Sequence, residues 1–426
     1  MKVFGVTAPS TGSGKTTVTM AFLSALPDSA AVKIGPDYID TGLESMVSGH
    51  PAHNMDRWIE GKGYLRMLDD LAQDYQYAVV EGVMGLYDSG SSIDLSTDYY
   101  FRKFRIPYIL VVDCSKTAES TYYISMGFLG KRCIGVILNN YGSQRHLEMV
   151  MSEFRRHGVR IIGSIPNRAE YRVESRNLGL HTSQEQVNLK ERIRGVAGCI
   201  DLSFLDELED YVPQARNKTN PPVNFTGRKI SVALDRAFNF YYSSSLEYLH
   251  RLGKVEYFSP VKGEGPDHPD MIYLGGGYPE LYAGELSRNQ RFRESILESS
   301  QTGKIVIAEC GGLMYLEKSI KTEDGTFQMA GVFNGTVEMD RRLTLSYTKL
   351  VARRDTVMFS KNQTVYGHEY HYSRVNDESD LALENFQGRG IDGKRDGLIF
   401  KNTQATYSHF SLARYGKKIE RELPLV

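Results

Sequence analysis

The chain has 426 residues, too many for one domain of ordinary size, and this length predicts two or three domains. Its 51 Lys and Arg residues nearly balance its 52 Asp and Glu residues, so the formal net charge is −1. Without a global positive field, the chain is not expected to bind nucleic acid or an anionic membrane surface. Hydrophobic residues make up 41% and charged residues 24%, which excludes the disordered and fibrous classes.

The chain shows no sign of secretion or membrane insertion. No apolar leader precedes the glycine-rich N-terminal segment, and no window holds the roughly 18 apolar residues of a membrane span. The four cysteines have no C-x-x-C spacing, so neither a zinc site nor a disulfide framework is predicted. We therefore expect a soluble, cytoplasmic protein.

Short β-branched runs alternate with longer amphipathic runs in the first half of the chain. The run at 109–113 is apolar without alternation, which is typical of a parallel strand covered on both faces. This layout predicts a doubly wound α/β domain over residues 1–210, ending in a polar, helix-prone stretch. The expected strands are 2–8, 30–34, 77–83, 106–113, 133–139 and 159–165.

The region 211–227 is rich in proline and turn-forming residues, and we interpret it as a linker. A second α/β domain is expected over 228–426. Its predicted strands are 229–234, 255–258, 271–274 and 304–308, and its predicted helices are 241–252 and 291–302. Segments 336–352 and 365–372 are expected to be antiparallel hairpin strands added to the same sheet.

A phosphate-binding loop is predicted between the first strand and the first helix. Its glycines let backbone N–H groups approach phosphate oxygens at the helix N-terminus. Lys15 would reach the outer phosphates, and the Thr16 hydroxyl would ligate Mg²⁺. The expected ATP-binding residues of the loop are Gly12, Ser13, Gly14, Lys15, Thr16 and Thr17.

Acidic residues follow the second and third strands, at the strand ends where ligands bind in parallel sheets. Asp37 and Asp40 follow the second strand, and Glu81 and Asp88 follow the third. Because Mg²⁺ prefers hard oxygen ligands, Thr16, Asp40 and Glu81 are the candidate metal ligands. The alternative for Asp37 and Asp40 is that each caps a helix or turn.

A nucleophilic thiol is predicted in the second domain. Cys310 stands between a hydrophobic strand and a helical pattern, followed by Gly311 and Gly312, which permit a sharp turn. The helix N-terminus would favour the thiolate of Cys310. The other cysteines, by contrast, lie in or beside apolar segments and are expected to be buried structural thiols: Cys114, Cys133 and Cys199.

The thiol needs a base, and His409 is favoured among ten histidines. His368 and His371 are the alternatives, as a base or as a metal pair, although their i, i+3 spacing on a strand places them on opposite faces. The glycine run after the strand at 271–274 offers backbone N–H groups for an oxyanion, chiefly at Gly276 and Gly277.

These stretches resemble, in order, the cobyrinic acid a,c-diamide synthase family. The resemblance extends over nearly the whole chain and is carried by the motifs APSTGSGKTT, KIGPDYIDTG, HNMDRW, VVEGVMGLYD, LNN, LGGGYPEL, AECGGLMYL, YGHEYHYSR and YSHF. It implies a dethiobiotin-synthetase-like P-loop domain followed by a class I glutamine amidotransferase domain.

The resemblance also implies roles for individual residues. Cys310 matches the glutaminase nucleophile and His409 its base, whereas Ser411 stands where class I glutaminase domains often carry a glutamate. That departure leaves open what orients the imidazole. The resemblance places Asn139 at the nucleobase, Asp40 and Asp88 among the catalytic groups of the synthetase site, and three residues at the tetrapyrrole substrate: Asp37, Tyr38 and Ile39.

The implied reaction is the amidation of the a and c acetates of a tetrapyrrole by ATP and glutamine, with Mg²⁺, through an acyl phosphate. Cobyrinic acid is the favoured substrate, and nickel-sirohydrochlorin of coenzyme F430 synthesis is the alternative. Cobyric acid synthase, another relative, differs around GPDYIDTG. A different class of function would be a P-loop regulatory ATPase with an inactive amidotransferase-like interaction domain. The metal of the macrocycle, the order of amidation and the oligomeric state stay open, a homodimer included.

Overall fold

The computed structural model describes residues 1–173, 183–214, 227–377 and 379–423. These residues divide into two compact units. Unit 1 comprises residues 1–57, 62–173 and 183–214, and unit 2 comprises residues 58–61 and the described residues from 227 onward. Most of the expected linker, 211–227, lies outside the described residues. Its first part belongs to unit 1, because the backbone N–H of Tyr211 donates to the Met1 carbonyl oxygen over 2.8 Å.

Unit 1 is built on one parallel sheet, seven-stranded over the described residues, in the order β3-β2-β4-β1-β5-β6-β7. Its strands are β1 (Lys2–Thr7), β2 (Ser29–Ile34), β3 (His53–Met55), β4 (Tyr77–Glu81), β5 (Tyr108–Asp113), β6 (Cys133–Tyr141) and β7 (Ile161–Pro166). Every residue of β2 is buried, Ser29 and Lys33 included, as expected for a strand of a sheet that is covered on both faces. The strand β3 was not predicted, because three residues are too few to show a periodicity.

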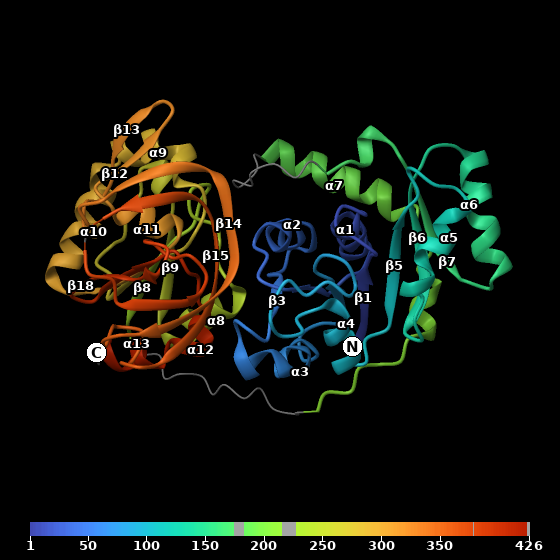
Figure 1. Ribbon diagram of the computed structural model, residues 1–426, viewed down its shortest axis with the longest axis horizontal. Helices are drawn as coiled ribbons and strands as arrows, with labels where there is room; N and C mark the ends of the chain where they lie inside the picture. The colour runs from blue at the N-terminus through green and yellow to red at the C-terminus, as the bar shows by residue number, and fades with distance from the viewer. Residues whose placement is uncertain (174–182, 215–226, 378, 424–426) are drawn as a thin grey trace. The chain divides into compact units, whose positions relative to one another are not determined.

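Helices surround this sheet, and α5 and α6 lie beside β5, β6 and β7 (Figure 1). The helices of unit 1 are α1 (Lys15–Ala25), α2 (Ile39–Ser48), α3 (Met67–Leu71), α4 (Thr97–Lys103), α5 (Ser120–Ser125), α6 (Gln144–Arg156) and α7 (Ser183–Ala197). The central position of β1 places the loop after it, and the helix α1 that follows, beside the end of β4.

Unit 2 contains two sheets. The first has the order β18-β19-β11-β10-β8-β9 and is parallel except for the β18–β19 pair. Its strands are β8 (Lys229–Ala233), β9 (Lys254–Phe258), β10 (Met271–Leu274), β11 (Ile305–Glu309), β18 (Leu398–Phe400) and β19 (Thr403–Thr406). The helices of unit 2 are α8 (Ser243–Leu252), α9 (Ala283–Arg288), α10 (Gln290–Thr302), α11 (Gly311–Leu316), α12 (Leu412–Tyr415) and α13 (Lys417–Glu422).

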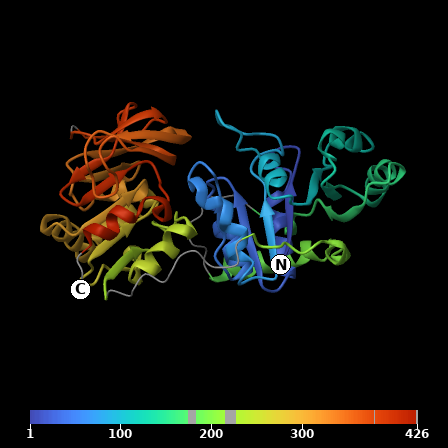
Figure 2. The ribbon, with the colours of Figure 1, turned by 90° about the horizontal axis from the view of Figure 1, so that it is seen from below.

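The segments expected to extend the first sheet form a separate sheet instead. β14 (Thr336–Ala352) and β15 (Thr364–Asn376) pair antiparallel, as expected, but β14 also pairs with β12 and β16. Figure 2 shows these orange strands apart from the yellow strands of the first sheet. The other strands of this second sheet are β12 (Ser319–Thr322), β13 (Gly325–Gln328), β16 (Leu383–Gln387) and β17 (Arg395–Asp396).

Candidate active sites

The loop between β1 and α1 has the backbone of a phosphate-binding loop. Gly12 and Gly14 adopt φ angles of 81° and 99°, in the left-handed region that glycine enters without strain. A Cβ atom on Gly14 would lie 2.2 Å from Nδ2 of Asn139, and that amide donates to the Ser13 carbonyl oxygen over 2.9 Å. Asn139, at the end of β6, therefore braces the loop, and its expected nucleobase contact stays a prediction.

Lys15 is 6% exposed, and its Nζ donates to the Ser10 carbonyl oxygen over 3.3 Å. Burial lowers the pKa of Lys15, and the positive charge of Lys33 lowers it further. An arriving anion would relieve both effects, because it would supply the ammonium with an opposite charge. Thr16 and Thr17 follow Lys15 in the first turn of α1.

The buried Lys33 contacts two of the three predicted metal ligands. The Nζ of Lys33 lies 2.5 Å from Asp40 Oδ2 and 2.6 Å from Glu81 Oε1, and Thr16 Oγ1 donates to the same Glu81 oxygen over 2.7 Å. Burial alone would lower the pKa of Lys33, but the charges of Glu81 and Asp40 outweigh it and raise this pKa well above its usual value. Lys33 is thus a fixed cation.

The three predicted ligands fit Mg²⁺ by chemistry, because a hydroxyl and carboxylate oxygens are its preferred donors. Over the described parts of the chain, no group of three or more His, Cys, Asp or Glu side chains is placed to hold a metal ion. Binding of Mg²⁺ by Asp40 and Glu81 would therefore depend on Thr16 and on oxygens supplied by the nucleotide. The assignment of these ligands stays a prediction.

Glu44 of α2 is fully buried beside Glu81 and was missed by the sequence reasoning. Burial raises the pKa of Glu44 well above its usual value, and the charge of Glu81 raises it further. Burial beside a second carboxylate therefore favours the neutral form of Glu44. Lys33, Glu44 and Glu81 form a buried cluster of ionisable side chains. Its signal in the sequence was Lys33, a charged residue within a mostly apolar strand, because a buried charge requires partners.

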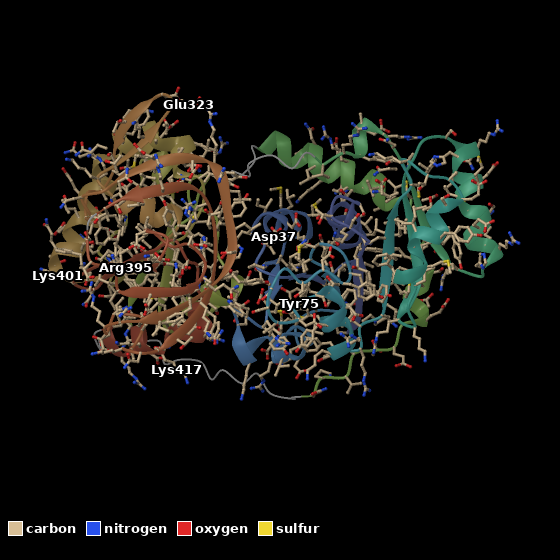
Figure 3. All side chains as sticks on the ribbon, viewed as in Figure 1. Asp37, Tyr75, Glu323, Arg395, Lys401 and Lys417 are labelled. Carbon is tan, nitrogen blue, oxygen red and sulfur yellow. The ribbon has the colours of Figure 1, made fainter. Side chains whose placement is uncertain are left out.

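The remaining acidic candidates stand on turns. Asp37, labelled in Figure 3, accepts the backbone N–H groups of Ile39 and Asp40 through Oδ1 at 2.8 and 2.9 Å, so it caps the start of α2. Burial and the charge of Asp40 raise the pKa of Asp37 to about 6. Asp88 is exposed, and its Oδ2 accepts the N–H of Gly85 over 2.9 Å. Their catalytic or substrate roles, with those of Tyr38 and Ile39, stay predictions.

In unit 2, Cys310 occupies the sharp turn between β11 and α11. Its φ is 49° and its ψ is −100°, a conformation that L residues rarely adopt. The thiol is 2% exposed and donates to the Tyr370 carbonyl oxygen over 3.2 Å. Burial raises the pKa of Cys310, and the N–H of Gly311 lowers it less, so the expected preference for thiolate is wrong for this state.

The topology brings His409 to the same edge of the sheet. β11 and β19 are parallel neighbours; Cys310 directly follows β11, and His409 comes three residues after β19 ends. A Cβ atom on Gly276 would lie 2.4 Å from Cε1 of His409, and one on Gly311 would lie 3.0 Å from the backbone nitrogen of Gly277. The glycine run after β10 therefore lies between the imidazole and the elbow, and oxyanion binding by Gly276 and Gly277 stays a prediction.

A carboxylate that the sequence reasoning did not single out adjoins the imidazole. Glu309 Oε2 lies 3.3 Å from His409 Nδ1, and both side chains are at most 2% exposed. Glu309 is the residue directly before Cys310. Its place in an apolar strand was the available signal, since a buried carboxylate requires partners.

Ser411, at the position of the usual class I glutamate, contacts Glu60. The Ser411 hydroxyl donates to Glu60 Oε2 over 3.0 Å, and Ser244 donates to Glu60 Oε1 over 2.7 Å. Glu60 belongs to the short segment 58–61, which is part of unit 2 although it precedes most of unit 1 in the sequence. Arg414 fastens this segment by donating to the Trp58 and Ile59 carbonyl oxygens.

The alternative histidines lie nearby on β15. His368 and His409 exchange backbone hydrogen bonds of 3.1 and 2.8 Å. Burial and, to a smaller extent, the charge of His409 lower the pKa of His368 to about 3. His371 stacks on Tyr407 at 3.8 Å. Of the three cysteines expected to be buried, Cys114 is buried, whereas Cys133 and Cys199 are only partly so.

The fold and the two sites define a P-loop nucleotide-binding unit joined in one chain to a glutamine amidotransferase unit. Residues 4–180 match the CobQ/CobB/MinD/ParA nucleotide binding domain, and residues 229–416 match the CobB/CobQ-like glutamine amidotransferase domain. No helix in the described ranges is long and apolar enough to cross a membrane.

Proteins named cobyrinate a,c-diamide synthase match nearly the whole chain. The one from Sulfolobus acidocaldarius is 33% identical over 423 residues, covering 96% of this chain and 97% of its own. The one from Methanosphaera stadtmanae is 36% identical over 440 residues, covering 96% and 95%. The chain belongs to the cobyrinate a,c-diamide synthase family of glutamine-dependent amidoligases.

Proposed function

We propose that the protein converts cobyrinic acid to its a,c-diamide, using ATP to activate each carboxylate and glutamine to supply the nitrogen. The observation that carries this proposal is that one chain holds both a phosphate loop and a Cys310–His409 elbow, and aligns over nearly its whole length with cobyrinate a,c-diamide synthases. Each of the two amidations requires one acyl phosphate and one ammonia.

In the first half-reaction, a substrate carboxylate oxygen attacks the γ-phosphorus of ATP, which gives an acyl phosphate and ADP. Lys15 and the loop N–H groups would hold the outer phosphates, because a buried ammonium without a full counter-charge gains most from an anion. Lys33 would hold Asp40 and Glu81 in place through its two ion pairs.

Mg²⁺ would be held by Thr16, Asp40 and Glu81, and when bound it supplies charge neutralisation for the transferred phosphoryl group. We predict that Glu81→Gln raises the Mg²⁺ concentration needed for half-maximal synthesis, because a neutral amide is a weaker ligand than a carboxylate. A Mg²⁺ titration of the synthesis rate measures this shift. An unchanged titration curve would remove Glu81 from the ligand set.

In the second half-reaction, Cys310 loses its proton to His409 and attacks the side-chain amide of glutamine. The N–H groups around Gly276 and Gly277 would stabilise the tetrahedral oxyanion. His409 then protonates the leaving amide nitrogen, which departs as ammonia, and water hydrolyses the thioester to glutamate and the free thiol. The raised pKa of Cys310 fits a resting thiol that is deprotonated only when glutamine is in place.

The test is product analysis by mass spectrometry after separate incubation with cobyrinic acid and with nickel-sirohydrochlorin, each with ATP, Mg²⁺ and glutamine. We expect a diamide from cobyrinic acid. Conversion of nickel-sirohydrochlorin alone would assign the other macrocycle. ATP hydrolysis that neither tetrapyrrole stimulates, without glutamine hydrolysis, would instead favour a regulatory ATPase.

A further inference from the structure

We propose that Glu309 is the positioning residue of the glutaminase site, holding the imidazole of His409 so that its Nε2 faces Cys310. This proposal rests on glutamine hydrolysis at Cys310, as proposed above. In class I glutaminase domains a glutamate two residues after the histidine usually orients the imidazole, and here Ser411 stands at that position. We assign this orienting role to Glu309, the residue directly before the nucleophile.

The contact would select the tautomer of the imidazole. Glu309 Oε2 lies 3.3 Å from His409 Nδ1. Because a carboxylate accepts hydrogen bonds, this neighbour would favour a proton on Nδ1 and would leave the lone pair on Nε2. A base that must take the thiol proton of Cys310 needs this arrangement.

Glu309 is itself held on both oxygens. The Tyr273 hydroxyl of β10 donates to Oε2 over 2.9 Å, and the backbone N–H of Phe410 donates to Oε1 over 3.0 Å. Phe410 follows His409 in the chain, and the backbone of His409 is also paired with that of His368. The carboxylate and the imidazole are therefore fixed to the same framework, which leaves the ring little freedom to turn.

The other edge of the ring lies beside the glycine run after β10. A Cβ atom on Gly276 would lie 3.0 Å from Nε2 of His409, and the next nitrogen, that of Gly277, lies against Gly311. With Nδ1 on Glu309, Nε2 is thus directed to the glycine run beside the nucleophile. The carboxylate would also stabilise the imidazolium that forms when Cys310 is deprotonated.

Glu60 is the rival carboxylate, because it accepts from Ser411, which takes the usual position of the class I glutamate. The hydroxyls of Ser411 and Ser244 donate to Glu60, whereas Glu309 Oε2 lies 3.3 Å from Nδ1 of the imidazole. Replacing Glu309 and Glu60 by glutamine, each in its own variant, distinguishes the two candidates.

The experiment measures glutamine hydrolysis by the full-length protein as a function of pH, for the wild type, Glu309→Gln and Glu60→Gln. For Glu309→Gln we expect kcat to fall by on the order of 10²–10⁴, with little change in KM, as when a triad carboxylate is replaced by its amide. The acid limb of kcat/KM should also move to lower pH, since loss of the negative charge destabilises the imidazolium. For Glu60→Gln this limb should not move.

The acid limb of kcat/KM can be assigned to His409 once the titratable groups around it on the neighbouring elements are considered. They are Glu309 of β11, Tyr273 of β10 through Glu309, and His368 of β15, whose backbone pairs with that of His409. His368, with its pKa lowered to about 3, is neutral throughout the assay range. A limb that moves when Glu309 is neutralised therefore reports the His409–Cys310 pair.

Glu317→Gln is the matched control for loss of a buried carboxyl, because Glu317 accepts the N–H of Gly335 at the far end of α11. Its glutamine hydrolysis should stay near that of the wild type. Alkylation of Cys310 by iodoacetamide, corrected with Cys310→Ala, should slow in Glu309→Gln and not in Glu317→Gln. Synthesis from ammonium should persist in Glu309→Gln, which shows that the variant is folded.

Unchanged kcat and pH profile in Glu309→Gln would overturn the proposal, as would a shift of the limb in Glu60→Gln alone. If Glu309→Gln does not fold, Glu309→Asp decides, because it keeps the charge but withdraws it by one methylene. It should lower kcat without moving the limb, and full activity would contradict a positioning role. A wild type that hydrolyses no glutamine would instead refute the proposed function itself.

Discussion

At the scale of single residues, burial is the largest cause of the pKa shift of a central residue in each candidate site. Lys15 and Cys310 are both buried, and burial disfavours the charged form of each. In the proposed reactions, a phosphate of ATP would stabilise the ammonium form of Lys15. The imidazole of His409 would accept the proton of Cys310 and so allow the thiolate to form.

We predict that Lys15→Ala lowers synthesis by about 10²-fold or more with either glutamine or ammonium, because the outer phosphates lose their principal cation. Diamide formation and glutamine hydrolysis are measured side by side. Glutamine hydrolysis should persist, and the exposed Lys131→Ala is the control that should leave both rates unchanged. Synthesis retained in Lys15→Ala would contradict the assignment of the phosphate loop.

At the scale of elements, the buried parallel strands could be predicted from the sequence, because apolar runs without alternation, such as that of β5, mark them directly. The loops after β1 and β11 could also be predicted, since small residues fix their turns. The separate second sheet could not, because the pairing of β14 with β12 and β16 depends on partners that no local pattern identifies.

The same limit applied to the site. The roles of Cys310 and His409 were inferred from local turns and from resemblance. The contact of Glu309 with His409, by contrast, forms only because β11 and β19 are neighbours in the folded sheet. Lys33 and Glu44 likewise appear as one cluster with Glu81 only after folding.

The turn after β10 gives a prediction at this scale. In Gly276→Ala the new Cβ would lie 2.4 Å from His409 Cε1, so the ring or the loop must move. We expect glutamine hydrolysis to fall by roughly 10²-fold, as for small displacements of catalytic groups, and synthesis from ammonium to persist. In the control, Gly284→Ala in α9, the nearest atom is 3.5 Å away. Equal glutamine hydrolysis in both variants would contradict the placement of His409.

A buried histidine on β15 gives the pH dependence of stability. The pKa of His368 is about 3 in the folded protein, below its ordinary 6.5, so only the unfolded chain takes up this proton between those values. The free energy of unfolding therefore falls as the pH drops below 6.5, by about 2–3 kcal/mol from this group at about pH 4.5.

His368→Gln should flatten that dependence, and urea unfolding of both proteins at several pH values measures it. The pKa of His53 in unit 1 is also lowered, to about 4, so some acid sensitivity should remain in the variant. Identical pH dependence in the two proteins would contradict a neutral, buried His368.

At the scale of the whole molecule, each unit carries one complete chemical task with its own core and its own sheet edge. The phosphate loop and the Lys33 cluster belong to unit 1, whereas Cys310, His409, Glu309 and the glycine run belong to unit 2. Because the candidate residues of the two sites, among those that the structure describes, belong to different units, we expect a defect confined to one site to leave the other half-reaction intact.

Cys310→Ala tests that division most directly. The change removes the nucleophile but no group of unit 1, so synthesis with glutamine should be lost. Synthesis with concentrated ammonium chloride should persist and should increase at raised pH, because more ammonia is then unprotonated and able to attack the acyl phosphate. Cys114→Ala, which alters another buried thiol, is the control and should keep synthesis with glutamine. Full activity of Cys310→Ala with glutamine would refute the nucleophile, and loss of both activities in a folded variant would refute the independence of the two half-reactions.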